Sequence, residues 1–187
     1  MKKQYLFIVV LLTVLNFQAQ ECSFLMEPVS LQARANEATL IIEGKVVSSL
    51  SYWDTSHHNI YTIHEISVYK TAKGLSSTTV FIETLGGQVG EEMQISSSAV
   101  KLEKGHTGIF FLKVSNHSFS IPQTTYRMVA AAQGFIKYDK VDNTASDIFN
   151  KYTSVEYDVY SRLESATNKS LRFYKSALKL MLLIHDL

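Results

Sequence analysis

Residues 39–74 read TLIIEGKVVSSLSYWDTSHHNIYTIHEISVYKTAKG, residues 78–98 read TTVFIETLGGQVGEEMQISSS, and residues 104–114 read KGHTGIFFLKV. β-Branched and aromatic residues form short runs in all three segments, and turns that contain glycine separate the runs. Runs of this composition and length are typical of β-strands, and several of them at this spacing favour a sandwich or a barrel. Gly44 lies inside the first run and predicts the bulge or sharp bend that a small barrel requires.

The first predicted strand runs from Leu40 through Trp53, and a polar loop at 54–59 joins it to a hairpin partner at 60–69. About five strands with one bent first strand fit the OB architecture best. We therefore expect a mainly β fold, with a small OB-like β-barrel over residues 38–138 and a C-terminal helical segment. Further short strands are predicted at 78–84, 93–97, 109–112, 126–130 and 134–138.

The flanks of the barrel carry weaker helical patterns. A lead-in over residues 20–37 contains a short helix, because Ser30 is a good N-cap and apolar residues follow it at helical spacing. Residues 139–153 are rich in Asp, Asn and Thr, and they predict a polar linker. A helical tail is expected over residues 154–187. Its first part has apolar residues four positions apart, at Val155, Val159 and Leu163.

The last twenty residues leave three interpretations open. Leu171, Tyr174, Leu178 and Met181 fall on one helical face, and an apolar run follows at 180–184. Such a segment fits a helix on a membrane surface, which is the only membrane contact we expect. A helix packed on the barrel fits equally. The third interpretation is that the tail is truncated and is not the native continuation of the domain.

Residues 1–19 have the features of a signal peptide. Lys2 and Lys3 precede an apolar run at 6–15, which is too short to span a bilayer, and Ala19 is a suitable small residue before the cut. An uncleaved anchor and a lipoprotein that uses Cys22 are the alternatives, although Glu21 stands where a lipoprotein needs a small residue. We expect a secreted protein, either periplasmic or extracellular.

Composition excludes some classes of function. The chain has 18 Lys and Arg against 17 Asp and Glu, and the barrel region contains no basic stripe. Nucleic-acid binding requires clustered basic side chains, so we expect no nucleic-acid partner. The single cysteine, Cys22, excludes an intramolecular disulfide bond. It is expected to be free or buried, and a bond between chains is the alternative.

The motifs of common enzymes are missing from the sequence. Ser96, Ser97 and Ser98 have no Gly-x-Ser-x-Gly context, and the glycines at 86–90 lack the GK[ST] ending of a phosphate loop. A metal site needs three or four converging ligands, whereas His57 and His58 are adjacent and point in opposite directions in an extended segment. We therefore predict no enzymatic activity, no cofactor and no metal.

Aromatic side chains on OB surfaces often stack on ligands. Tyr52 and Trp53 precede the 54–59 loop, and His57 and His58 lie within it. These four residues are the candidate interaction surface. A structural role for Tyr52 and Trp53, in the core or at the barrel rim, is the competing interpretation.

The order GKVV, YWD, IYT, VYKTAKG, GGQVG and FFL, followed by QGFIKY at 133–138, resembles an N-terminal domain of large secreted bacterial proteins. Some of those proteins carry type IX secretion sorting domains, and some carry matrixin-type zinc metalloproteases. The resemblance covers about residues 22–165. The proteases hold zinc with a His-Glu-x-x-His helix, and this chain has none. The resemblance implies a non-catalytic accessory or interaction domain, as the N-terminal part of a larger extracellular protein with a protein partner.

A looser similarity leads to another class of protein. Cys22, the PVSL segment at 28–31, and the run from Ile41 to Val47 resemble netrin-like and tissue-inhibitor OB modules. Those inhibitors place the amine of an N-terminal cysteine on the zinc of a metalloprotease. The alternative function is therefore a metalloprotease inhibitor or regulatory domain. Cleavage after Ala19 leaves Gln20 and Glu21 ahead of Cys22, which departs from that pattern.

Overall fold

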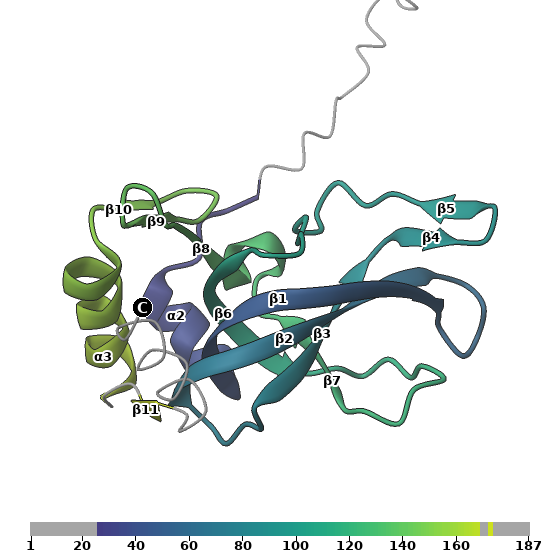
Figure 1. Cartoon of the computed structure of the whole chain (residues 1–187), viewed down its shortest axis with the longest axis horizontal. Coiled ribbons are helices and arrows are strands. Elements are labelled where there is room, and N and C mark those ends of the chain that lie inside the picture. The colour runs from purple at the N-terminus through teal and green to yellow at the C-terminus, as the bar shows by residue number, and fades with distance from the viewer. Residues whose placement is uncertain (1–25, 169–171, 174–187) are drawn as a thin grey trace, which may run out of the picture.

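The structure is a computed structural model that describes residues 26–168 and 172–173. A short helix and two long strands open the described part of the chain, and shorter strands follow (Figure 1). The elements are α2 (Leu31–Glu37), β1 (Leu40–Trp53), β2 (Ile60–Lys73), β3 (Thr79–Leu85), β4 (Gly87–Val89), β5 (Glu92–Gln94), β6 (Thr107–Val114), β7 (Thr125–Met128), η1 (Ala131–Gly134), β8 (Phe135–Asp139), β9 (Thr144–Ser146), β10 (Lys151–Tyr152), η2 (Val155–Tyr160), α3 (Ser161–Thr167) and β11 (Arg172–Phe173).

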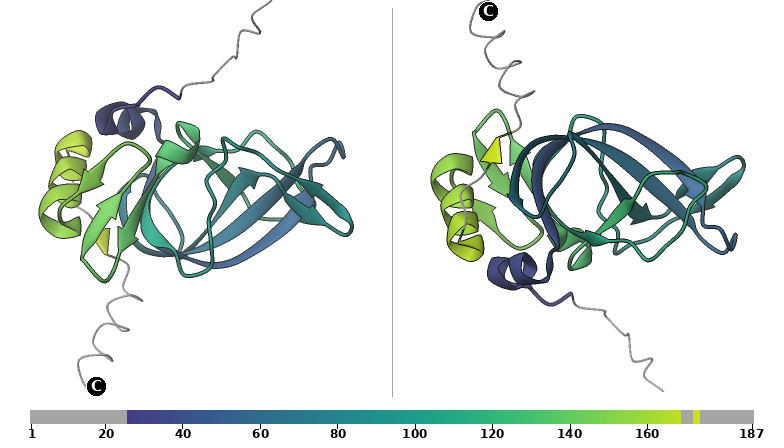
Figure 2. Two further views of the ribbon diagram at one scale, coloured as in Figure 1. Left: turned by 90° about the horizontal axis from the view of Figure 1, so that it is seen from above. Right: turned by 90° about the horizontal axis from the view of Figure 1, so that it is seen from below.

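Five strands close into a ring. The sheet runs in the order β1-β2-β3-β7-β6, and β6 also pairs with β1. The β3–β7 pairing is parallel, and the other pairings of the ring are antiparallel. Seen from above and from below, the ribbon of these strands curves into a ring (Figure 2). The expected mainly β fold with an OB-like barrel and a C-terminal helix is confirmed.

At Gly44, strand β1 pairs with two neighbouring strands. It pairs with Val68 of β2 on one side and with Gly108 of β6 on the other, and the β1–β2 register shifts between Glu43 and Gly44. A Cβ atom on Gly44 would lie 2.6 Å from the Ile66 side chain and 2.6 Å from the Ser67 carbonyl oxygen. A larger residue would therefore push β2 away. The predicted bulge at this glycine is confirmed, and it allows β1 to bend from one side of the barrel to the other.

Apolar side chains divide into two cores. The inside of the ring is filled by one cluster of buried residues, namely Leu40, Ile42, Val46, Ile66, Val68, Val80, Ile82, Leu102, Phe110, Leu112, Met128 and Phe135. The opposite face of β1 and β6 packs against the helices and the last strands through Ile41, Phe111, Ile136, Val159 and Leu163. Because residues 109–112 alternate between the two cores, all four are buried, as predicted for this strand.

The segment expected to be a polar linker, residues 139–153, instead extends the sheet. Two short strands, β9 and β10, follow β8, and they bury Ala145 and Tyr152. The turn before β9 places Asn143 at φ +53°, a conformation that asparagine tolerates. Strands of two or three residues are too short to produce a periodic pattern, so polar turn residues dominated the sequence signal there.

Both predicted helices form. Ser30 accepts a hydrogen bond from the Ala33 backbone N–H and caps α2, as expected. The helix predicted after residue 153 begins as a π-helical turn, η2, which Ser154 caps, and it continues as α3. Val155, Val159 and Leu163 are buried, which confirms the apolar face. Among the described residues, no helix is long and apolar enough to cross a membrane.

A buried ion pair fixes α2 to the added strands. Arg34 Nη2 lies 2.9 Å from Asp147 Oδ2, and each side chain is only 1% exposed. Arg34 Nη1 also donates to the Gln133 carbonyl, and Asp147 accepts from Tyr152 Oη at 3.1 Å. Burial opposes ionisation of Asp147, but the Phe149 and Asn150 backbone N–H groups and Arg34 together lower its pKa. The lead-in, β9 and β10 therefore form one unit with the barrel.

Two sets of predicted features lie mostly outside the described residues. The signal peptide and Cys22 belong to residues 1–25. Of the tail interpreted as an apolar helix, only Asn168, Arg172 and Phe173 are described. Arg172 and Phe173 form β11 and pair with Thr71 and Lys70 of β2.

Candidate functional site at the barrel mouth

The β1–β2 hairpin, the β4–β5 hairpin and the β6–β7 loop lie at the end of the barrel opposite α3 (Figure 1). The β1–β2 hairpin contains the four residues predicted as an interaction surface. Tyr52 and Trp53 end β1 and are half-buried, and they pair with Tyr61 and Ile60 at the start of β2. The turn that follows is exposed. The structure therefore places the predicted residues on the rim of the barrel.

Aromatic stacking and a carboxylate organise this turn. Trp53 stacks on His57 with 6.0 Å between ring centroids and an interplanar angle of 17°. Asp54 Oδ1 accepts from the His58 backbone N–H at 2.9 Å, and His58 Nδ1 lies 3.1 Å from Ser56 Oγ. The two histidines thus have different partners. Within the described ranges, no group of three or more His, Cys, Asp or Glu side chains is arranged to hold a metal ion.

A second loop joins this rim from a distant part of the chain. The β6–β7 loop, residues 115–124, contacts the hairpin turn through the Thr55 backbone N–H, which donates to the Ser118 carbonyl at 3.1 Å. Ser115 Oγ accepts from the His117 backbone N–H at 2.9 Å and fixes the start of the loop. This contact could not be predicted from local patterns, because 63 positions separate its two residues in the chain.

The loop brings His117 onto the outer face of β2 and β3. His117 Nδ1 lies 2.6 Å from Glu83 Oε1, and His117 Nε2 lies 3.2 Å from Tyr61 Oη. Phe119 packs edge-on against the Tyr61 ring, with 5.4 Å between centroids. A carboxylate, an imidazole and a phenol are therefore connected in that order across β3, the β6–β7 loop and β2.

The direction of these hydrogen bonds follows from the carboxylate. Ionised Glu83 can only accept, so Nδ1 of His117 carries the proton that joins them. In the neutral imidazole Nε2 is then an acceptor, and the Tyr61 hydroxyl donates to it. Burial raises the pKa of Tyr61, and the nearby Glu83 and Asp54 charges raise it further. Tyr61 is therefore held as a neutral phenol.

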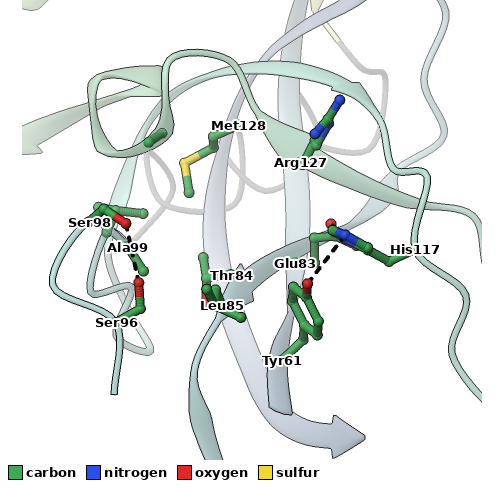
Figure 3. Close-up of a pocket in the computed structure, with 12 residues that line it drawn as sticks. Tyr61, Glu83, Thr84, Leu85, Ser96, Ser98, Ala99, His117, Arg127 and Met128 are labelled. Carbon is green, nitrogen blue, oxygen red and sulfur yellow. Dashed lines mark hydrogen bonds and ion pairs between the residues drawn. The ribbon is translucent and has the colours of Figure 1, made fainter. Parts of the chain in front are cut away.

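Beside this triad lies a pocket of about 210 Å³ at the point where β3 and β7 diverge. Figure 3 shows Arg127 and Met128 along one edge, and Ser96 and Ser98 opposite the Tyr61–His117 pair. Most of the lining is apolar or hydroxyl-bearing. It comprises Tyr61, Glu83, Thr84, Leu85, Ser96, Ser98, Ala99, Val100, His117, Arg127, Met128 and Ala131.

Arg127 is the charged side chain of this pocket that lacks a partner. The β3–β7 register places it opposite Glu83, yet Glu83 bonds His117 and not Arg127. Arg127 Nε is buried and has no hydrogen-bond partner among the described residues. No ion pair of Arg127 occurs in this part of the chain either. The guanidinium makes no hydrogen bond or ion pair among the described residues, so its terminal nitrogens are the donors left for a ligand with an acceptor group.

A second polar cluster lies between the barrel and η2. Glu43 Oε2 accepts from Tyr160 Oη at 2.5 Å and from Tyr138 Oη at 3.2 Å, and Lys70 Nζ lies 3.5 Å away. Burial, followed by the Glu43 charge, raises the pKa of both tyrosines. None of these four residues lines a pocket described here. We interpret this cluster as the attachment of the helix to the barrel.

No protein-family model, curated protein or solved structure matches this chain. The chemistry of the site is therefore argued from its own residues. Trp53 and His57 were predicted as part of a surface, and they lie on the same rim as the triad. Tyr61, Glu83 and His117 were not predicted, because only the closure of the barrel brings them together.

Proposed function

We propose that this protein is a non-catalytic secreted interaction domain that binds a protein partner with the mouth of its barrel. The observation that carries the proposal is the joining of two loops at the barrel mouth, through Thr55 and Ser118, beside a pocket to which the second loop contributes His117. These loops and strands β1 and β2 present Trp53, His57 and Phe119 with Tyr61 on one rim. Loops of this position and the adjacent strand face are where OB folds bind their ligands.

The triad supports binding better than catalysis. A nucleophilic or basic tyrosine needs a lowered pKa, whereas the pKa of Tyr61 is raised by burial and by Glu83. Glu83 and His117 instead connect β3 to the β6–β7 loop through a 2.6 Å hydrogen bond. In the proposed function this bond fixes the loop in the shape that the partner recognises, and pre-organisation of this kind improves affinity.

The resemblance to N-terminal domains of large secreted bacterial proteins adds the biological setting. In that setting the domain is an accessory part of an extracellular protein. The metalloprotease-inhibitor alternative depends on Cys22, which lies outside the described residues. No described contact favours the inhibitor, so the accessory domain is the function that we propose.

Photo-cross-linking tests this function. Benzoylphenylalanine replaces His58 on the rim in one variant and Lys140, an exposed residue of the β8–β9 turn, in the other. We expect the His58 variant to form an adduct with an extracellular protein of the source cells. Unlabelled protein should compete for the adduct, and a Trp53→Ala, His57→Ala variant should not. Absence of the rim adduct, or an equal adduct from position 140, would contradict the proposal.

A further inference from the structure

We propose that the pocket between β3 and β7 receives the C-terminal residue of a partner chain, with its free carboxylate on Arg127 and its apolar side chain among Leu85, Val100 and Met128. The inference rests on the proposed function, because it assigns a chemistry to the partner. Its three supports are the unpaired guanidinium, the size of the pocket and the adjoining hollow.

Arg127 determines which charged group the ligand carries. Its guanidinium forms no ion pair in the described chain, and Glu83, the acid opposite it in the register, is occupied by His117 and Thr125. A planar guanidinium matches a carboxylate with two parallel hydrogen bonds, which are among the strongest in proteins. The nearest other basic residue in the register is Lys113, and it already pairs with Glu37. Arg127 is thus the cation of this wall that is left for a ligand.

The size of the pocket determines which apolar side chain the last residue of the ligand carries. A volume of about 210 Å³ lies below the range of about 300–1,000 Å³ that is usual for drug-sized ligands. It is suited to one side chain. Leu85, Val100 and Met128 supply an apolar wall, so a Leu, Met or Phe side chain is expected rather than a polar one.

The neighbouring hollow indicates a peptide rather than a free acid. A second hollow of about 230 Å³ runs along the β6–β7 loop, and His117 lines both. Val114, Phe119 and Ile121 contribute to its lining. An extended chain whose last residue fills the first pocket therefore finds a second hollow across His117 for a preceding residue.

The test measures binding of short peptides to the purified protein by calorimetry and by NMR titration. The probes are acetyl-Gly-Ser-Ala-Ala-X peptides with X as Leu, Met or Phe, each with a free or an amidated C-terminus. We expect at least one free-acid peptide to bind, and its amide to bind about ten- to a hundredfold more weakly, since one charge-assisted hydrogen bond is lost. Isocaproate, a free acid of similar shape, should bind much more weakly than the peptide.

Four variants connect this result to the pocket. Arg127→Gln should abolish the preference for the acid over the amide. Lys140→Gln removes the same charge from an exposed turn and should preserve it. Ala99→Phe should fill the pocket and abolish binding of every peptide, while near-native β circular dichroism shows that the fold is intact. Arg127→Lys, which keeps the charge, should retain part of the preference.

Several results would overturn the inference. The inference is wrong if no free-acid peptide binds, or if acid and amide bind equally. It is also wrong if the preference for the acid over the amide survives Arg127→Gln, or if isocaproate binds as tightly as the best peptide. A rim adduct in the cross-linking experiment together with a failure of all peptides would refute this inference alone. The proposed interaction function would then stand.

Discussion

Glu83 of β3 and His117 of the β6–β7 loop lie 2.6 Å apart, from Oε1 to Nδ1, and the Glu83 side chain is only 3% exposed. The bond is the main donor contact of a buried carboxylate, since Thr125 Oγ1 is 3.5 Å from the other oxygen. It also connects a strand of the barrel to a surface loop. The stability of the barrel and the shape of the rim therefore depend on the same pair.

His117→Ala should destabilise the protein by about 1–3 kcal/mol, because it leaves the Glu83 carboxylate buried without its main donor. The free energy of unfolding from urea titration measures this change. His58→Ala is the matched control on the same rim. It removes an exposed imidazole and should change the free energy by less than about 0.5 kcal/mol. Equal effects of the two variants would show that the Glu83–His117 bond does not stabilise the fold.

The sequence predicted local features of the fold but not the contact between Glu83 and His117. Local sequence patterns predicted the strands, the Ser30 cap and the bulge at Gly44, because each of these features depends on residues within a few positions. The β3–β7 parallel pairing, by contrast, depends on closure of the whole ring. Glu83, His117 and Tyr61 are isolated polar residues in their own segments, and only that closure gives them their common site.

In the segment 139–153, the local composition predicted a linker where the structure has two short strands. Its polar residues form turns, since Asp139 Oδ1 accepts from the Val141 backbone N–H at 2.9 Å. The strands between the turns were not recognised, because β9 and β10 have three and two residues. The burial of Arg34 and its pairing with Asp147 were not predicted either, since a lone arginine in a short helix is usually exposed.

Arg34→Met should be strongly destabilising. The substitution leaves Asp147 without its cation in a site where both side chains are 1% exposed, and breaking a buried pair costs about 3–5 kcal/mol. Thermal and urea unfolding measure the change. Arg162→Ala is the control, since its side chain is 63% exposed in an ion pair with Asp158, and such pairs contribute about 0–1 kcal/mol.

The double variant Arg34→Met, Asp147→Asn distinguishes charge from packing. It removes the uncompensated charge, so it should be more stable than Arg34→Met alone. A double variant that is less stable than the single one would show that the Arg34 side chain acts through its contacts with Gln133 and Phe111.

Tyr160→Phe tests the attachment of the C-terminal helix. Its hydroxyl donates to Glu43 at 2.5 Å and accepts from Lys70 at 2.6 Å, so its loss removes a donor from a buried carboxylate. We expect a loss of about 1–3 kcal/mol in the free energy of unfolding. Tyr157→Phe makes the same chemical change on an exposed side chain and should be nearly neutral. A neutral Tyr160→Phe would indicate that the apolar contacts of Val159 and Leu163 are sufficient for docking.

His64 predicts a dependence of stability on pH. It is buried between Ser49 and Thr84, with Nδ1 2.7 Å from one hydroxyl and Nε2 2.9 Å from the other, and burial lowers its pKa to about 4 from 6.5. Between these values the unfolded chain binds a proton at His64 that the folded chain does not bind. Stability is therefore complete above pH 6.5 and falls as the pH decreases towards 4.

The expected size of this effect is about 2–3 kcal/mol between pH 7 and pH 4.5. His64→Gln keeps a group that can hydrogen-bond to Ser49 and Thr84 but cannot titrate in this range. The free energy of unfolding of this variant should fall less over the same interval, by about that amount. His58→Gln controls for the loss of a histidine as such. If wild type and His64→Gln lose stability in parallel as the pH falls, His64 is not the group that resists protonation in the fold, and another buried residue has to account for the acid sensitivity.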